Sequence, residues 1–475
     1  MEIHKEMNQA FINSFIPIAI GTNPNAMKKR QILLLACLLI LISASMVMAI
    51  SFSGNHNSGR TEIVIEPEPR DTTMDHEESG CVFKTVFEGQ FNFDSLKYET
   101  PQQVKSSLEK ALTWLMASQH NDGGWGAGSH YHQEITDPAA VPSDPATTAM
   151  VSMSLLRCEN TPTSGKYKIQ LNKAIEFLLT SVEASKNESL TITELQNTQP
   201  QIKLGQNIDV VLTSQFLTNL LDHISNDQKM EHRIKDAVGV CIAKIEKAQS
   251  ENGSFSGGAW AGVLQSSFAT TALESAESKG IEVDTVVLNN ARNYQSGNYD
   301  AGSGTIKTDD AAGVMLYSIS STSRSTAQDA NTAKMELKKA KEEGKLDEDA
   351  EITTENLKKA GMSEAEAMKV VSAYEINNAA KTQAMSNDVM TGFGNNGGEE
   401  FLSFLQTGEG MIVGNDNTWK KWYDNVSVTL LNIQEPDGNW SGHHCITSPV
   451  FCTATAVLIL SINNDVEELA LMGHQ

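Results

Sequence analysis

The sequence predicts an all-α protein built from repeated helical hairpins. Its first support is a run of apolar residues that recur every three or four positions, with charged residues between them, which is typical of amphipathic helices. This run begins after Pro101 and contains Val104, Leu108, Leu112 and Leu115. The alternation of apolar and polar residues that indicates strands is scarce. The third observation is an internal repeat, described below.

The composition excludes some classes of function. The chain has 475 residues, with 36 Lys and Arg against 59 Asp and Glu, and a formal net charge of −23. Phosphate backbones repel so acidic a chain, and we therefore expect no nucleic-acid partner. The 6 cysteines are too few for a scaffold built on disulfides in a chain of this length.

An uncharged apolar stretch near the amino terminus predicts export. Residues 31–48 follow the basic residues Lys28, Lys29 and Arg30, as in a signal peptide. Residues 1–49 are thus predicted as a signal peptide cleaved after Ala49, or as an uncleaved membrane anchor through residues 31–49. Both alternatives place the remaining chain outside the cytoplasm, as a periplasmic, secreted or membrane-anchored protein.

The exported part divides by composition. Residues 50–100 are polar and predicted to be a linker, and 101–475 form the helical domain. Residues 180–230 have a helical pattern without the glycine–aromatic turn of the repeat. Residues 323–375 are highly charged, and we expect a helical insertion that forms a solvated surface arm.

Three segments follow one plan, in which a Gln is followed four residues later by Gly and six residues later by an aromatic residue. A helix rich in Thr and Ala comes next. The three sets are Gln119, Gly123 and Trp125; Gln249, Gly253 and Phe255; and Gln434, Gly438 and Trp440. A weaker fourth copy contains Gln295, Gly297 and Tyr299.

Each copy predicts a helix, a tight turn and a second helix. The glycine allows a positive φ after the first helix. The aromatic ring can then lie back over the end of that helix, where the Gln amide can satisfy carbonyl groups of the loop. One hairpin cannot bury its apolar face alone, so these repeats predict stacking.

This pattern resembles the repeat of the terpene cyclase and protein prenyltransferase superfamily, the Gln–Trp motif of squalene cyclases. The resemblance covers roughly residues 101–465, and the turns at Trp125 and Trp440 are its most specific parts. It implies an α/α toroid, in which an inner and an outer ring of helices close on themselves. The chain would then be an exported protein with prenyltransferase and squalene oxidase repeats.

The resemblance suggests one set of catalytic residues. Cyclases of the superfamily protonate their substrate with the middle Asp of a DxDD motif, and the nearest match is Lys307-Thr308-Asp309-Asp310. Asp309 would be the proton donor beside Asp310, but Lys307 replaces the first Asp and favours the ionised form of its neighbours. In the alternative, both aspartates cap a helix.

A metal site is a second possibility. Two histidines follow the first turn, and two histidines and a cysteine follow the last one. If the ring closes, these five side chains become neighbours on its rim, the end at which the inner helices begin. Imidazole and thiolate groups are good Zn²⁺ ligands. The residues are His130, His132, His443, His444 and Cys445. They could instead be exposed histidines, or Cys445 could pair with Cys452 in a disulfide.

Aromatic residues are candidates for a ligand cavity or for the rim. These are Trp125, Trp260, Trp440, Trp419, Trp422 and Tyr423. The last three could form a platform for a carbohydrate or a peptide, or pack between repeats. Glu399 and Glu400 could face the cavity, although capping of a helix is the preferred interpretation.

Taken together, these patterns favour a non-catalytic binding or scaffold toroid with an unknown ligand or protein partner. The alternative is an enzyme, either an isoprenoid cyclase or transferase that uses Asp309, or a metal-assisted enzyme that uses the rim histidines. The Asp-x-Cys zinc motif of protein prenyltransferases does not occur in the sequence.

Overall fold

The computed structural model describes residues 95–473, except 225–226, 256, 309–310, 312 and 393–396. The predicted signal or anchor segment and most of the predicted linker lie outside the described residues. The same holds for Asp309 and Asp310.

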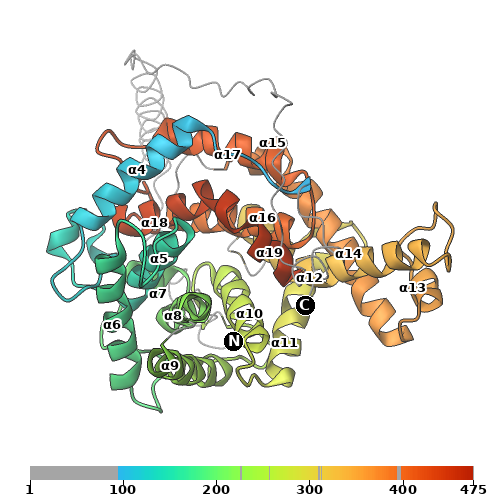
Figure 1. Cartoon of the computed structure of the whole chain (residues 1–475), viewed down its shortest axis with the longest axis horizontal. Coiled ribbons are helices and arrows are strands. Elements are labelled where there is room, and N and C mark those ends of the chain that lie inside the picture. Colours follow the sequence, from blue (N-terminus) through green and yellow to red (C-terminus); the bar gives the residue numbers. More distant parts are fainter. Residues whose placement is uncertain are drawn as a thin grey trace, which may run out of the picture. The chain divides into compact units, whose positions relative to one another are not determined.

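The described residues are mostly helical, which confirms the all-α prediction (Figure 1). The longer helices are α4 (Gln102–Ala117), α5 (Pro145–Arg157), α6 (Lys168–Ala184), α8 (Ile208–Leu220), α9 (Gln228–Lys247), α10 (Gly262–Ser278), α11 (Thr285–Ser296), α12 (Met315–Glu342), α14 (Glu364–Ala384), α16 (Gly398–Val413), α17 (Trp419–Ile433) and α18 (Pro449–Leu460).

Shorter elements connect them. They are η2 (His130–His132), η3 (Pro138–Ala140), α7 (Gln199–Lys203), η4 (Leu221–His223), α13 (Thr354–Ala360), α15 (Asn387–Met390), η6 (Ile462–Asp465) and α19 (Val466–Met472). A short antiparallel ribbon pairs β1 (Tyr299–Asp300) with β2 (Thr305–Ile306), and Tyr299 lies opposite Ile306.

The helices differ in how far they are buried. Helix α18 is buried over its whole length, and α5, α8, α10 and α16 are nearly so. By contrast, α4, α6, α9 and α17 are amphipathic and bury one face. Two of the buried helices start in the same way, because Asp144 and Ser448 cap α5 and α18, and a proline follows each cap.

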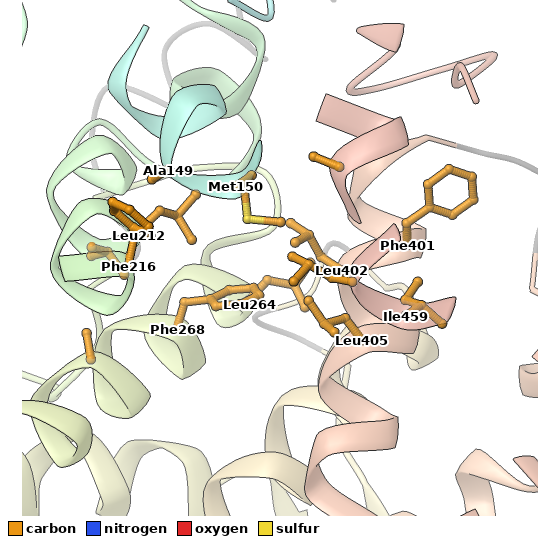
Figure 2. Packing of buried hydrophobic residues seen from close by; sticks show 14 of the residues in the cluster. Ala149, Met150, Leu212, Phe216, Leu264, Phe268, Phe401, Leu402, Leu405 and Ile459 are labelled. Atoms are coloured by element: carbon orange, nitrogen blue, oxygen red, sulfur yellow. The ribbon is translucent and has the colours of Figure 1, made fainter. Parts of the chain in front are cut away.

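The buried helices pack in a series that returns to its start. Helix α5 packs against α8, α8 against α10, α10 against α12, α12 against α16, α16 against α18, and α18 against α5. Apolar side chains of α5, α10 and α16 belong to one core between these helices, among them Met150, Phe268 and Leu405 (Figure 2).

The three repeat turns share one geometry. The indole Nε1 of Trp125 donates to the carbonyl of Leu115 at 2.7 Å, and that of Trp440 donates to Leu430 at 2.8 Å. Both carbonyls lie ten residues earlier, at the end of the preceding helix. These two bonds confirm that the indole ring lies back over the preceding helix at Trp125 and Trp440, and Phe255 at the same position of the second repeat is also buried.

The glutamines link each repeat to the next. Each side-chain amide donates to the carbonyl of the glycine in its own turn, at 2.9, 3.3 and 2.8 Å for Gln119, Gln249 and Gln434. It also donates to a carbonyl of another helix, which belongs to Gln170 in α6, Val287 in α11 and Ser107 in α4, respectively. The last repeat therefore bonds to the first helix of the domain.

The fourth copy does not share this geometry. Gln295 is buried and donates to Val263 in α10, the preceding long helix. Gly297 has a φ of −64°, whereas the turn glycines of the three confirmed copies have positive φ values. The chain then enters the β1–β2 ribbon instead of a tight turn, so the prediction of a fourth turn is wrong.

The predicted insertion begins inside the protein. Ser323, Arg324 and Ala327 are buried, because α12 enters the core before it extends outward. Beyond this point α12, α13 and α14 share a small apolar cluster of their own, formed by Ala333, Leu337, Leu357, Ala367 and Val370. The charged arm therefore starts later than residue 323.

In the described part of the chain, no single helix has both the length and the apolar character needed to cross a membrane. The pair Pro449–Leu460 and Ile462–Met472, bent by 54°, passes that test by length and composition only.

Candidate functional site

The loops after the first and last repeat turns meet at the amino-terminal ends of α5 and α18. The Nε2 atom of Gln133 lies 2.9 Å from His130 Nδ1 and donates to the carbonyl of Cys445 at 2.7 Å. Burial and the positive charge of Lys203 lower the pKa of His130. The structure thus brings His130 and the loop with His444 and Cys445 together, as the ring-closure hypothesis expects.

The cysteine in this group is a protonated thiol at neutral pH. Burial raises the pKa of Cys445 to about 11, and its Sγ lies 2.7 Å from His444 Nδ1. A thiol in this state is a weak nucleophile. Cys452 donates to the carbonyl of Ile446 at 3.3 Å, and both cysteines are free. The disulfide alternative is therefore wrong.

The five predicted metal ligands do not form one cluster. His132 has an exposed side chain and faces Glu134 at 3.2 Å, and His443 lies in the loop that holds His444. Within the residues that the structure describes, no group of three or more His, Cys, Asp and Glu side chains could hold a metal ion. The arrangement thus offers Zn²⁺ no set of ligands there.

Glu399 stabilises the loop of the last repeat. It is buried in the first turn of α16, where its Oε2 accepts a hydrogen bond from the backbone N–H of Ile446 at 3.0 Å. Burial raises the pKa of Glu399 to about 7. Helix α16 follows Gly397, which provides no side-chain cap, and Glu399 and Glu400 both lie in the first turn of this helix, as the preferred interpretation expects. Glu400 is also buried.

Most of the candidate aromatic residues belong to the interior. Five side chains are at most 1 % exposed: Trp125, Trp440, Trp419, Trp422 and Tyr423. The rings of Trp419 and Tyr423 contact each other and Tyr98 edge to face, which fits the packing interpretation. Trp260 differs, because it is 54 % exposed and the Lys203 ammonium lies 5.3 Å from its ring centroid.

A cavity of about 440 Å³ lies toward the other ends of the same helices. Its walls come from α5, α8, α10, α12, α16 and α18, together with η6 and α19. None of the candidate site residues above lines it. Its apolar wall includes Met150, Leu156, Phe268, Leu405, Leu458 and Met472.

Arg157 in the cavity wall is fully paired. Its Nη2 donates to Glu409 at 2.8 Å, its Nε to Asp465 at 2.5 Å, and its Nη1 to the carbonyl of Leu458 at 3.0 Å. Burial alone lowers the pKa of Arg157, but the two carboxylates more than offset this and raise it. This guanidinium therefore joins α5, α16, α18 and η6.

Arg324 in the same wall is buried without such partners. It is 3 % exposed, and its Nε lies 3.9 Å from Glu409 Oε2, which is too long for a hydrogen bond. Among the described residues, no atom accepts a hydrogen bond from this Nε. Buried arginines are ordinarily paired and hydrogen-bonded, so Arg324 is the exceptional polar group of the cavity.

The sequence contains a signal that could have identified Arg324 as a buried charge. The prediction of a charged arm from residue 323 onward assigned Arg324 to the surface instead. The run from Met315 to Gln328 carries no other charged residue and is rich in Ser and Thr. A single arginine in an uncharged helical run indicates a buried charge with a specific task. No comparable signal marks Glu409 or Asp465, which approach Arg157 only through the tertiary fold.

Comparison with known proteins assigns no family. No model of a known protein family matches the sequence, and no curated protein matches it.

Proposed function

We propose that the helical domain is an α/α toroid. In this arrangement α5, α8, α10, α12, α16 and α18 form the inner ring, and α4, α6, α9, α11, α14 and α17 the outer ring. Two observations support it: the series of packed helices that leads from α5 back to α5, and the hydrogen bond from Gln434 to Ser107 between the last and first repeats. We also propose that the domain is exported, on the basis of the basic and apolar segment at residues 28–48.

We propose further that the protein is a non-catalytic binding protein for a small ligand with a large apolar part. The observation that carries this function is the cavity of about 440 Å³ between the inner helices. Cavities of roughly 300–1,000 Å³ in which a few polar groups converge beside apolar side chains are typical ligand sites. Met150, Phe268 and Leu405, which Figure 2 labels, line the apolar side of this cavity, and polar or charged side chains line the rest.

The test uses Nile red, a neutral apolar dye, in a fluorescence titration of the exported chain. Thr271 lines the cavity from α10 and is partly exposed, so Thr271→Trp fills the space with little disturbance of the core. We expect the wild type to bind the dye and Thr271→Trp to weaken binding by about tenfold or more. The matched control is Thr382→Trp on the exposed face of α14, which should bind like the wild type.

Equal binding by the two tryptophan variants would contradict a ligand site in the cavity. Incubation with squalene and with prenyl diphosphates addresses catalysis separately. Under the proposed function neither substrate gives a product. A product that disappears in Asp309→Asn would replace the binding function with a cyclase or a transferase.

A further inference from the structure

We propose that the ligand of this cavity is a monocarboxylate with an apolar tail, and that Arg324 binds its carboxylate. The inference rests on the proposed binding function and adds the chemical class of the ligand and the residue that recognises it.

The Arg324 guanidinium is buried and incompletely paired. Its side chain is almost completely buried, and its Nε has no hydrogen-bond acceptor among the described residues. Leaving a buried charged donor unpaired costs more free energy than leaving a neutral one. Since Arg324 forms part of the cavity wall, a ligand in the cavity can approach its guanidinium group and pair with the charge.

Glu409, the carboxylate beside Arg324, is already engaged by Arg157. Its Oε1 accepts a hydrogen bond from Arg157 at 2.8 Å, while its Oε2 lies 3.9 Å from Arg324. The Glu409 carboxylate is thus shared between two guanidinium groups. Asp465 is a second ion-pair partner of Arg157. A second carboxylate beside Arg324 would form a charge-assisted pair, for which the planar arginine fork is well suited.

The acidic residues of the cavity wall limit the charge that a ligand can carry. Besides Arg157 and Arg324, the wall contains Glu159, Glu409, Asp465 and Glu468. Burial and the charge of Asp465 already raise the pKa of Glu468. A phosphate monoester would bring nearly two negative charges into this acidic wall, whereas a carboxylate brings one. Among anionic ligands, the surroundings therefore favour one negative charge over two.

Helix α16 connects the charged part of the cavity wall with its apolar part. Leu405 and Glu409 are one helical turn apart on α16 and both line the cavity, so they lie on the same face of that helix. The Oε2 atom of Glu409 lies 3.9 Å from Arg324 Nε, and Leu405 belongs to the core with Met150 and Phe268 (Figure 2). A carboxylate at Arg324 can therefore extend its tail along this apolar wall.

The experiment is a calorimetric titration of the full chain with three probes that have the same tail: decanoate, decanol and decyl phosphate. The wild type should bind decanoate more tightly than decanol and decyl phosphate. Arg324→Met should weaken decanoate binding by about tenfold or more and leave decanol binding unchanged. Arg324→Gln is a second variant that keeps polar character without the charge, and it should behave in the same way.

The matched control is Arg233→Met, which removes an arginine from the surface of α9, where it pairs with Glu176 and Glu183. It should bind all three probes like the wild type. Equal decanoate affinity in Arg324→Met and the wild type would overturn the role of Arg324, and tighter binding of decyl phosphate would overturn the monocarboxylate. If decanol and decanoate both fail to bind, the proposed binding function itself fails.

Discussion

The buried polar groups at the two ends of the buried helices differ in how they are paired. At the amino-terminal ends, buried side chains bind the loops: Gln199 Oε1 accepts hydrogen bonds from the backbone N–H groups of Thr447 and Ser448, at 2.7 and 3.0 Å. The buried oxygens without a partner there include Asp209 Oδ1 and Glu399 Oε1, in carboxyl groups whose pKa burial raises to about 7. Toward the carboxyl-terminal ends, the cavity contains Arg324, whose Nε has no acceptor within the described chain. A carboxyl group can bind a proton and lose its charge, whereas an arginine keeps its charge, and the incompletely paired Arg324 therefore marks the candidate ligand site.

The two arginines of the cavity provide the strongest test of this distinction. Arg157→Met leaves the carboxylates of Glu409 and Asp465 without their main partner, and we expect a loss of about 3–5 kcal/mol in the free energy of unfolding. Arg324→Met removes a charge that has only a distant partner, and should change this free energy by less than about 1 kcal/mol. Urea unfolding followed by circular dichroism measures both values.

The order of these two effects is the decisive result. A loss in Arg324→Met as large as that in Arg157→Met would mean that Arg324 supports the fold through the protein alone. The cavity would then resemble the amino-terminal ends, and its polar groups would give no reason to expect an anionic ligand.

A smaller effect is expected where one repeat contacts the next. Gly253 has a φ of +86°, and a Cβ atom there would lie 2.3 Å from the carbonyl oxygen of Asn290 in α11. Gly280 has a similar φ of +73° but open space around it. We expect Gly253→Ala to destabilise by about 2–3 kcal/mol and Gly280→Ala by about 1 kcal/mol, since both introduce left-handed strain but only the first adds a clash.

Thermal unfolding of the two glycine variants measures that difference. Equal shifts in Tm would show that the contact between repeats contributes little to stability, and that the turn glycines are needed only for their backbone conformation.

The repeat turns could be predicted from the sequence because their main contacts are local. The indole of Trp125 reaches a carbonyl ten residues earlier, and Gln119 reaches the glycine four residues later. A spacing of this kind is visible in the chain itself. A similar pattern at Gln295 led to the wrong prediction of a fourth turn. Gly297 does not take a positive φ there, and the Gln295 amide donates to a carbonyl of α10 instead.

The cavity could not be predicted in the same way because its partners are distant in the chain. Arg157 pairs with Asp465, 308 residues later, and with Glu409, 252 residues later. No spacing rule connects such positions, and only closure of the helical series brings them together. Among these residues, only Arg324 could be recognised from its neighbours in the sequence, because it is the single charged residue between Met315 and Gln328.

The last prediction concerns the amino-terminal ends and depends on pH. Burial raises the pKa of Glu399 to about 7, whereas an unfolded Glu titrates near about 4.3. Between these values the folded protein holds a proton that the unfolded chain has lost, so this group makes the free energy of unfolding fall as pH rises. Its contribution to the slope is about 1 kcal/mol per pH unit.

Glu399→Gln removes this titration and should flatten the decline in stability between about pH 5 and about pH 6.5. The amide can still accept the hydrogen bond from Ile446 that the carboxylate accepts. Asp209, whose pKa burial also raises to about 7, continues to titrate in both proteins and cancels in the comparison. Glu282→Gln, an exposed change of the same charge in the loop before α11, should keep the wild-type slope. If Glu399→Gln had the same slope as the wild type, Glu399 would be charged in the folded state. The amino-terminal ends would then also bury an ionised group, and they would no longer differ from the cavity in this respect.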